Sequence, residues 1–213
     1  MKWFCRNISV AAALLFFLSS HASADIKLPA PQTEGGMGLF QALKERSSAP
    51  GGDFPTAPLS MEDLSTILWS ATGLNRGEKG WTVPMAHGLP PYVYICAALE
   101  SGVYRYDWAA NALVEISKED IRGKIGAQRF VASASCSLIF ISSAEGLVDV
   151  KDEDLKKHFA SVAAGAMTQD VYLAAAALNV GARYIHSIKF PETRSLIGIP
   201  DEDEILCLMI LGK

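Results

Sequence analysis

Residues Asp152 to Asn179 read DEDLKKHFASVAAGAMTQDVYLAAAALN, a run whose apolar positions recur with the period of an α-helix. The run is dense in alanine between Ala160 and Ala177. Small side chains let helix axes approach closely. We therefore expect a helix at the centre of the fold that can meet its own copy across a dimer axis. Gly181 follows the last apolar position and predicts where the helix stops.

Strand patterns lie on both sides of this helix. Apolar segments predict strands at 182–188 and 205–211 after it and at 137–142 before it, with a three-stranded meander at 92–99, 103–108 and 113–116 and a helical stretch at about 120–132. Two shorter helices are predicted at 39–46 and 60–73, the second beginning with Ser60 and with Asp63 three residues later. This order predicts an α+β fold: a mixed or antiparallel sheet flanked by helices, with the long alanine-rich helix at its centre.

The first 24 residues have the layout of a secretory signal peptide. Lys2 and Arg6 precede an apolar run over 8–18, and a small-residue triplet follows at 22–24. The run is shorter than the roughly 20 residues that span a bilayer, so a retained membrane anchor is the less favoured alternative. We expect an exported protein, periplasmic or secreted, with a signal peptide over 1–24, an extended N-terminal arm over 25–37 and one domain over 38–213.

The composition disfavours nucleic-acid binding. The formal net charge is −4 at pH 7 and becomes −6 when the signal peptide, with its two positive charges and no acidic residue, is removed. An acidic chain without a cluster of Lys or Arg lacks the electrostatic footprint that a phosphate backbone requires. Cys96, Cys136 and Cys207 each lie in an apolar run, which predicts small buried side chains, with one disulfide as the open alternative.

Several kinds of active site have no matching motif in the chain. There is no Gly-x-Ser-x-Gly elbow of a serine hydrolase and no Gly-x-x-x-x-Gly-Lys-Ser/Thr phosphate loop. The histidines at 87, 158 and 186 are far apart and no CxxC pair is present, so no metal site is predicted. The glycines at 35–38 follow no predicted strand, so they do not match a dinucleotide-binding turn.

Two segments are candidate ligand sites. Arg46, Ser47 and Ser48 combine a permanent cation with two hydroxyls at a helix end, a mixture that suits a phosphate group. An arginine in the last helical turn can equally compensate the helix dipole. The segment TVPMAHG at 82–88 is a stiff loop whose backbone can lie against a flat ring, or else an ordinary connection into the next strand.

Taken together, these two segments and four others resemble the nitroreductase family. The others are SATGLNRG at 70–77, GVYRYD at 102–107, QDVYLAAAALNVGA at 169–182 and CLMILGK at 207–213. More narrowly, the chain resembles the branch with the thiazoline and oxazoline dehydrogenases of azole-peptide maturation. The resemblance covers 38–213 and rests on the order and spacing of the segments. It implies a homodimer that holds FMN at the shared interface, with a donor that reduces the flavin and a small-molecule acceptor that takes the electrons.

The resemblance also assigns cofactor-binding residues but no catalytic residue. The family's phosphate-binding motif falls on Arg46, Ser47 and Ser48, and its loop beside the flavin falls on Pro84, Met85, Ala86 and His87. The stretch after the long helix, which contacts the other face of the ring in relatives, falls on His186 and Ser187. A basic residue after the last strand falls on Lys213.

Departures from the family pattern leave two functions open. Pro50 stands where relatives usually carry a second basic residue, Met85 replaces the usual serine, and no Lys-Tyr pair is present. Nicotinamide donors are scarce outside the cytoplasm, so the donor of an exported enzyme need not be NAD(P)H. We expect an FMN-dependent oxidoreductase; the alternative is an exported binding protein that keeps this fold without flavin chemistry.

Overall fold

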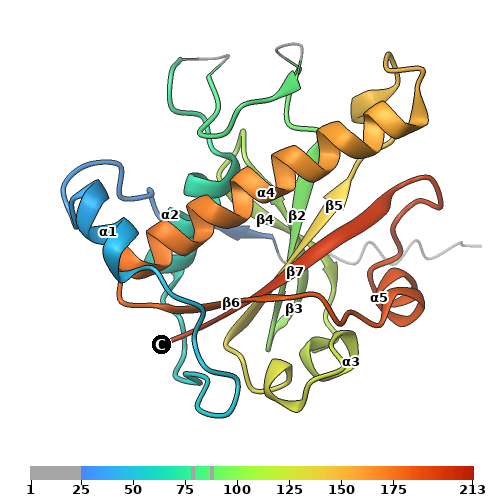
Figure 1. Cartoon of the computed structure of the whole chain (residues 1–213). Coiled ribbons are helices and arrows are strands. Elements are labelled where there is room, and N and C mark those ends of the chain that lie inside the picture. Colours follow the sequence, from blue (N-terminus) through green and yellow to red (C-terminus); the bar gives the residue numbers. More distant parts are fainter. Residues whose placement is uncertain (1–24, 78–79, 87–88) are drawn as a thin grey trace, which may run out of the picture.

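The sheet is antiparallel and helices cover it, as Figure 1 shows. The structure is a computed structural model that describes residues 25–77, 80–86 and 89–213. Within those residues, one seven-stranded sheet has the order β1-β4-β3-β2-β5-β7-β6, with antiparallel pairing throughout. Its strands are β1 (Ile26–Lys27), β2 (Val93–Leu99), β3 (Gly102–Asp107), β4 (Ala112–Ser117), β5 (Cys136–Ser142), β6 (Gly181–Ile185) and β7 (Glu204–Gly212). The predicted α+β fold is confirmed.

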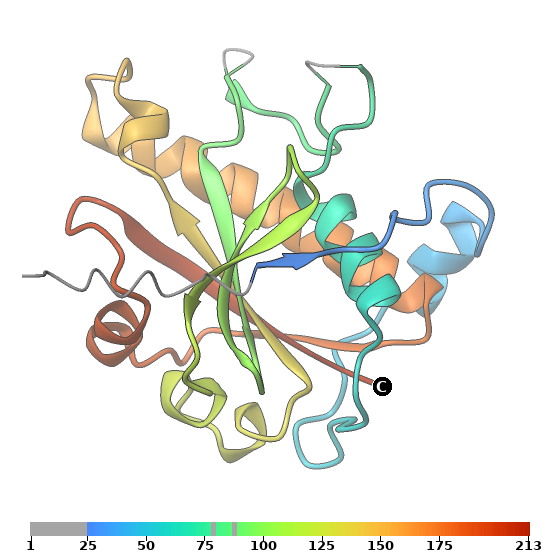
Figure 2. The same ribbon diagram turned by 180° about the vertical axis from the view of Figure 1, so that it is seen from behind.

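The helices divide between the two faces of this sheet. The long helix α4 (Glu153–Ala177) crosses one face diagonally together with α2 (Met61–Thr72), and α1 (Leu39–Glu45) lies near the C-terminal end of α4. The short helices α3 (Arg122–Ile125) and α5 (Phe190–Ile197) pack at the other face (Figures 1 and 2). Strand β5 is buried along its whole length. Its alternate residues Phe140 and Ile139 belong to the two separate core clusters, as the two-residue period of a strand requires.

The long helix begins and ends at identifiable residues. The carboxylate of Asp152 accepts hydrogen bonds from the backbone N–H groups of Asp154 and Leu155, at 2.9 and 3.1 Å, which caps the N-terminus. At the other end Asn179 has φ +55°, and the N–H of Val180 donates to the carbonyl of Ala175 at 2.8 Å. This is the left-handed termination that closes many helices.

The predicted stop at Gly181 is therefore wrong, because Asn179 ends the helix. Gly181 instead begins β6, where a close contact with the loop before α2 requires a glycine. A Cβ atom at this position would lie 2.6 Å from Cγ of Pro55. The glycine allows the loop before α2 to lie against the edge of the sheet.

Some of the other predicted helices and strands are confirmed and others are not. The helix at 60–73 is confirmed with its cap, since the Ser60 hydroxyl accepts a hydrogen bond from the N–H of Asp63 at 3.1 Å, and the meander is confirmed as β2, β3 and β4. The stretch at 120–132 forms only α3 and a short 3₁₀ turn, Arg129–Val131. Helix α5 and strand β1 were not expected. The prediction of a signal peptide at 1–24 lies outside the described residues.

The three cysteines of the described chain are buried thiols. Burial raises the pKa of Cys96, Cys136 and Cys207 to about 12 in each case, so these thiols stay protonated and unreactive at neutral pH. They pack as small hydrophobic side chains, as predicted. None of the described helices is both long and apolar enough to cross a membrane.

Candidate functional site

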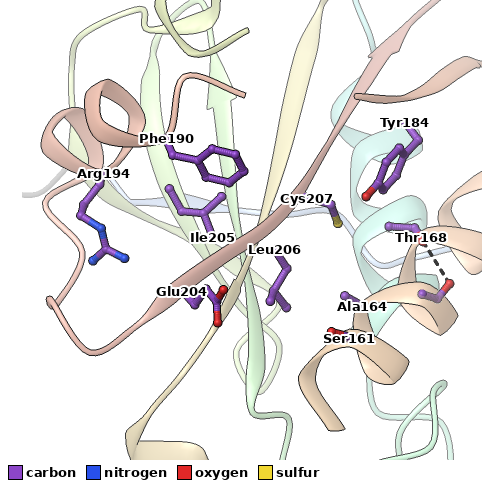
Figure 3. A pocket seen from close by; sticks show the side chains of 11 residues that line it. Ser161, Ala164, Thr168, Tyr184, Phe190, Arg194, Glu204, Ile205, Leu206 and Cys207 are labelled. Carbon is purple, nitrogen blue, oxygen red and sulfur yellow. Dashed lines mark hydrogen bonds between the residues drawn. The ribbon is translucent and has the colours of Figure 1, made fainter. Parts of the chain in front are cut away.

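A groove of about 440 Å³ lies between α4 and the C-terminal elements β6, α5 and β7. Figure 3 shows Thr168 from α4 facing Tyr184 from β6, with Cys207 from β7 and Phe190 from α5 further along. The α4 residues that line it are Ser161, Ala164, Gly165 and Thr168. They recur every three or four positions, so they form one stripe on the helix. Small side chains along this stripe keep the groove open.

Tyr172 lies one helical turn beyond Thr168 on α4, outside the residues that line the groove. Its hydroxyl accepts a hydrogen bond from the backbone N–H of Tyr184 at 2.7 Å and shares another with the Ser48 hydroxyl at 2.8 Å. The guanidinium carbon of Arg46 lies 5.2 Å from the centroid of the Tyr172 ring, a cation–π distance. Tyr172 thus links Tyr184, which lines the groove, to the predicted phosphate-binding residues.

The loop that follows α1 is fixed to the edge strand β6. The N–H of Ala49 donates to the carbonyl of Ala182 at 2.9 Å, and the Arg183 guanidinium donates to the carbonyl of Ala49 at 2.8 Å. Among the described residues, the Arg46 guanidinium has no ion pair. Ser47 is exposed and, with Tyr172, lines a small cavity of about 70 Å³. The loop therefore holds the Arg46 guanidinium and the Ser47 hydroxyl in fixed positions.

This arrangement suits a ligand with two different ends, one anionic and one flat and mostly apolar. An anion fits at the loop, where a guanidinium and hydroxyl donors converge. A flat, mostly apolar body fits along the stripe of small residues on α4, between Tyr184 and Phe190. The far end of the groove carries Arg194 and Glu204; the Arg194 guanidinium donates to the carbonyl of Pro200 at 2.7 Å, which fixes it there.

The second predicted segment lies far from the Arg46 loop within one chain. Pro84, Met85 and Ala86 lie near the N-terminal half of α4: the N–H of Ala86 donates to the Tyr92 hydroxyl at 3.2 Å, and that hydroxyl donates to the carbonyl of Phe159 at 3.4 Å. Thirteen residues separate Phe159 from Tyr172 along α4, which is about 20 Å at the rise of an α-helix. The predicted His87 lies outside the described residues.

The remaining predicted residues also lie apart from Arg46. His186 and Ser187 are exposed in the turn after β6, where the carbonyl of Ser187 accepts a hydrogen bond from Ala127 at 2.9 Å. The Lys213 ammonium pairs with the Asp63 carboxylate at 2.6 Å, so its charge is already compensated. Sequence reasoning missed Tyr172, although it stands out as a lone aromatic residue in the alanine-rich half of the helix. Among the residues that the structure covers, no group of His, Cys, Asp and Glu could hold a metal ion.

Comparisons with known proteins agree on one family. A model of the nitroreductase family matches residues 44–213. A protein of Methanocaldococcus jannaschii assigned as a nitroreductase is 29% identical over 171 residues, which cover 76% of this chain and 84% of that protein. A solved structure from Ralstonia eutropha JMP134, also assigned as a nitroreductase, is 29% identical with a TM-score of 0.81, covering 89% of both chains.

Two more distant structures share the fold. A chain of the microcin synthetase McbBCD complex of Escherichia coli is 15% identical with a TM-score of 0.68, covering 98% of this chain and 84% of that chain. The NADPH:FMN oxidoreductase of Vibrio harveyi is 19% identical with a TM-score of 0.57, covering 82% of this chain and 67% of that chain. Sequence identities this low show a shared fold and nothing more.

Proposed function

The chain belongs to the nitroreductase family, and from this premise we propose that it is an FMN-dependent oxidoreductase that passes electrons from a reduced donor to a small-molecule acceptor. Family membership supports an oxidoreductase in general terms. The name of one fold neighbour, an NADPH:FMN oxidoreductase, supports FMN as the cofactor. That this chain has a reduced electron donor and a small-molecule electron acceptor is likewise proposed.

A track of contacts from Arg46 and Ser48 through Tyr172 to Tyr184, which lines the groove, carries this proposal. FMN has a phosphate at one end and a flat ring system at the other, which matches a cationic loop followed by an elongated groove. The groove volume of about 440 Å³ falls in the range of pockets that hold small molecules and cofactors. The donor set fits a phosphate, since a guanidinium with no ion pair within the described chain adjoins two serine hydroxyls.

Each residue of the track has a definable task. Arg46, Ser47 and Ser48 would hold the phosphate, and Tyr172 orients Ser48 through the 2.8 Å hydrogen bond. Tyr184 and Phe190 would bound the ring and exclude water from it. Bound FMN would supply the electron-accepting centre that the side chains lack, while the protein positions the ring and shapes its electrostatic surroundings.

A homodimer completes the proposed site. In one chain, Pro84, Met85 and Ala86 lie far from Arg46, but a loop of this kind can reach a flavin held by the other subunit. The helix α1 presents apolar side chains to solvent, with Leu39 62% and Phe40 85% exposed. Val162 on the outer face of α4 is 54% exposed. A contiguous exposed apolar patch, such as Leu39, Phe40 and Leu43 form on α1, is typical of a surface covered in an assembly.

Export is the second part of the proposal. Residues 1–24 carry the layout of a signal peptide, so we propose that the mature protein is periplasmic or secreted. Such a location favours a donor other than NAD(P)H, because nicotinamide nucleotides are scarce there. The buried state of all three cysteines in the described chain suits an oxidising compartment, since a buried thiol resists oxidation.

The test is an absorbance spectrum of the purified protein before and after incubation with FMN and dialysis. We expect a retained flavin band. Replacing Arg46 by Ala removes a charge-assisted contact of about 1.5 to 3 kcal/mol, which weakens FMN binding roughly ten- to hundredfold. Lys44→Ala is the matched control, because it removes a cation from the same helix two residues earlier. An Arg46→Ala protein that binds FMN as well as the Lys44→Ala protein contradicts the assignment.

One other function has specific support. Met85 supplies no hydroxyl to a flavin, and the Lys213 charge is paired with Asp63, so two contacts expected from the family are absent or occupied. These features favour a binding protein that keeps the fold without flavin chemistry. Colourless protein that also refuses added FMN is the outcome that establishes this alternative over the oxidoreductase.

A further inference from the structure

A second pocket, of about 310 Å³, lies between α2 and α4 beneath residues 32–37 of the N-terminal arm. Its α4 wall includes Asp170, Leu173 and Ala177, which occupy a different side of the helix from the stripe that lines the groove. Its α2 wall includes Trp69 and Thr66. The pocket is thus separate from the proposed flavin site, and none of the predicted cofactor-binding residues lines it.

The arm that covers the pocket is held in place by hydrogen bonds. The N–H of Gln32 donates to the Thr66 hydroxyl at 3.0 Å. Just before it, the carbonyl of Pro29 accepts hydrogen bonds from the Ser65 hydroxyl at 2.6 Å and from the Asn111 amide at 2.9 Å. The cover is therefore part of the folded structure and gives the pocket a defined third wall.

The pocket carries negative charge that nothing in its walls compensates. Glu34 and Asp170 line it, and its lining includes no Lys, Arg or His. Within the described residues, the Asp170 carboxylate has neither a hydrogen bond nor an ion pair, and burial alone raises its pKa to about 6. A partly desolvated carboxylate without a partner is unfavourable, and a cation placed beside it relieves that cost.

An aromatic ring stands in the α2 wall of the pocket. The Trp69 indole N–H donates to the carbonyl of Leu74 at 2.9 Å, which fixes the ring, and Trp69 lines the pocket together with Leu173 and Leu178. Indole is the side chain that attracts cations most strongly through its face. The combination of two carboxylates, an indole and leucine side chains therefore selects for a ligand that is both cationic and apolar.

We propose that this pocket binds a small organic ammonium ion, with its charge beside Asp170 and its apolar body between Trp69 and Leu173. A bare metal ion fits poorly, because no cluster of metal-ligating side chains exists in the described chain and the volume far exceeds that of one ion. An anion is disfavoured by Glu34 and Asp170. The proposal goes beyond the flavin chemistry and does not depend on it.

The experiment is a calorimetric titration of the purified protein with phenylethylamine, which is protonated at pH 7.5. We expect binding that weakens at least about tenfold in an Asp170→Asn variant and that is similarly weaker for 2-phenylethanol, which has the same body without the charge. Asp149→Asn, at an exposed loop position, is the matched control and should bind the amine like the unaltered protein. Glu34→Gln supplies a second variant on the arm, with a smaller expected loss.

Three results overturn the proposal. The first is no binding of phenylethylamine up to roughly 10 mM. The second is equal affinity in the Asp170→Asn and Asp149→Asn variants, and the third is equal affinity for the amine and the alcohol, which would make the pocket merely apolar. Repeating the titration after incubation with FMN separates this site from the proposed flavin site, because the amine affinity should stay the same whether or not FMN is retained.

Discussion

Tyr172 shows how a single hydroxyl can organise a site. It is buried on α4, and its one oxygen serves both the backbone N–H of Tyr184 and the hydroxyl of Ser48. A buried N–H group without a partner is costly, so Tyr172 stabilises the edge of the sheet while it orients a predicted phosphate ligand. The residue that positions the candidate site is thus also a residue of the folded core.

Asp170 predicts a loss of stability as the pH rises from about 4 to about 6. Its folded-state pKa is about 6, raised by burial, whereas an unfolded aspartate titrates near 3.9. Below about pH 4 the carboxyl group is neutral in both states and makes no difference. As the pH rises to about 6, the unfolded state ionises more readily, so the folded state loses stability and does not regain it at higher pH. Asp170→Asn removes this loss.

The melting temperature of the Asp170→Asn variant should therefore match that of the unaltered protein near pH 4 and exceed it above about pH 6. Thermal denaturation followed by circular dichroism over this pH range measures the difference in melting temperature. The other carboxylates are the same in both proteins, so their effect on the melting temperature cancels. A difference that is constant from pH 4 to 8 would mean that Asp170 titrates normally. The result would also show that the variant folds, as the amine titration requires.

At the residue scale, the sequence identified candidate residues by their chemical type. It did not identify residues whose role depends on contacts with distant parts of the chain. Arg46 and the serines after it were predicted because a guanidinium beside hydroxyls suits phosphate. Tyr172 was missed because its contact with Ser48 joins residues 124 positions apart. Lys213 was matched to a flavin contact, but its ammonium pairs with Asp63, 150 positions away. Neither long-range pairing leaves a trace in the local sequence.

At the scale of elements, the end of α4 yields a stability prediction. Asn179 holds φ +55°, a conformation that costs most residues about 1 to 2 kcal/mol and glycine much less. Asn179→Ala should destabilise the protein by about 1 kcal/mol, which lowers the melting temperature by about 2 to 4 °C for a chain of this size. Asn179→Gly is the matched control and should retain the original stability. Equal melting temperatures for the Ala and Gly variants would refute the role of Asn179.

Elements with long patterns were predictable from the sequence, whereas short ones were not. Helix α4 spans 25 residues and has a clear helical period. Strand β5 holds the apolar run Leu138–Ile141, rich in β-branched isoleucine, so length and composition identify it. Helix α5 has eight residues, too few for a clear period, although Pro191 in its first turn and Gly198 at φ +67° are local signals of a helix start and stop. Strand β1 has two residues and exists only through its pairing with β4.

At the scale of the whole molecule, the two pockets lie on opposite sides of α4 and leave a third side uncovered. Val162 and Leu155 belong to that side, being 54% and 40% exposed. Gly165, on the stripe that lines the groove, has no heavy atom within 4 Å of where its Cβ would be, so the groove is open at this point. A second copy of the chain that covers this side would bury Val162 and Leu155, neither of which lines either pocket.

Dimerisation through this side is the last prediction. Light scattering at micromolar concentration should give twice the mass of one chain, and Val162→Glu should weaken the dimer by at least about tenfold, because association would bury an unpaired carboxylate. The control is Val114→Glu on β4, which places the same charge on a valine that is 39% exposed and should leave the dimer intact. If the flavin site is shared, Val162→Glu also lowers FMN retention while Val114→Glu does not. A monomeric mass for the unaltered protein would instead confine any flavin to one chain and contradict the shared site.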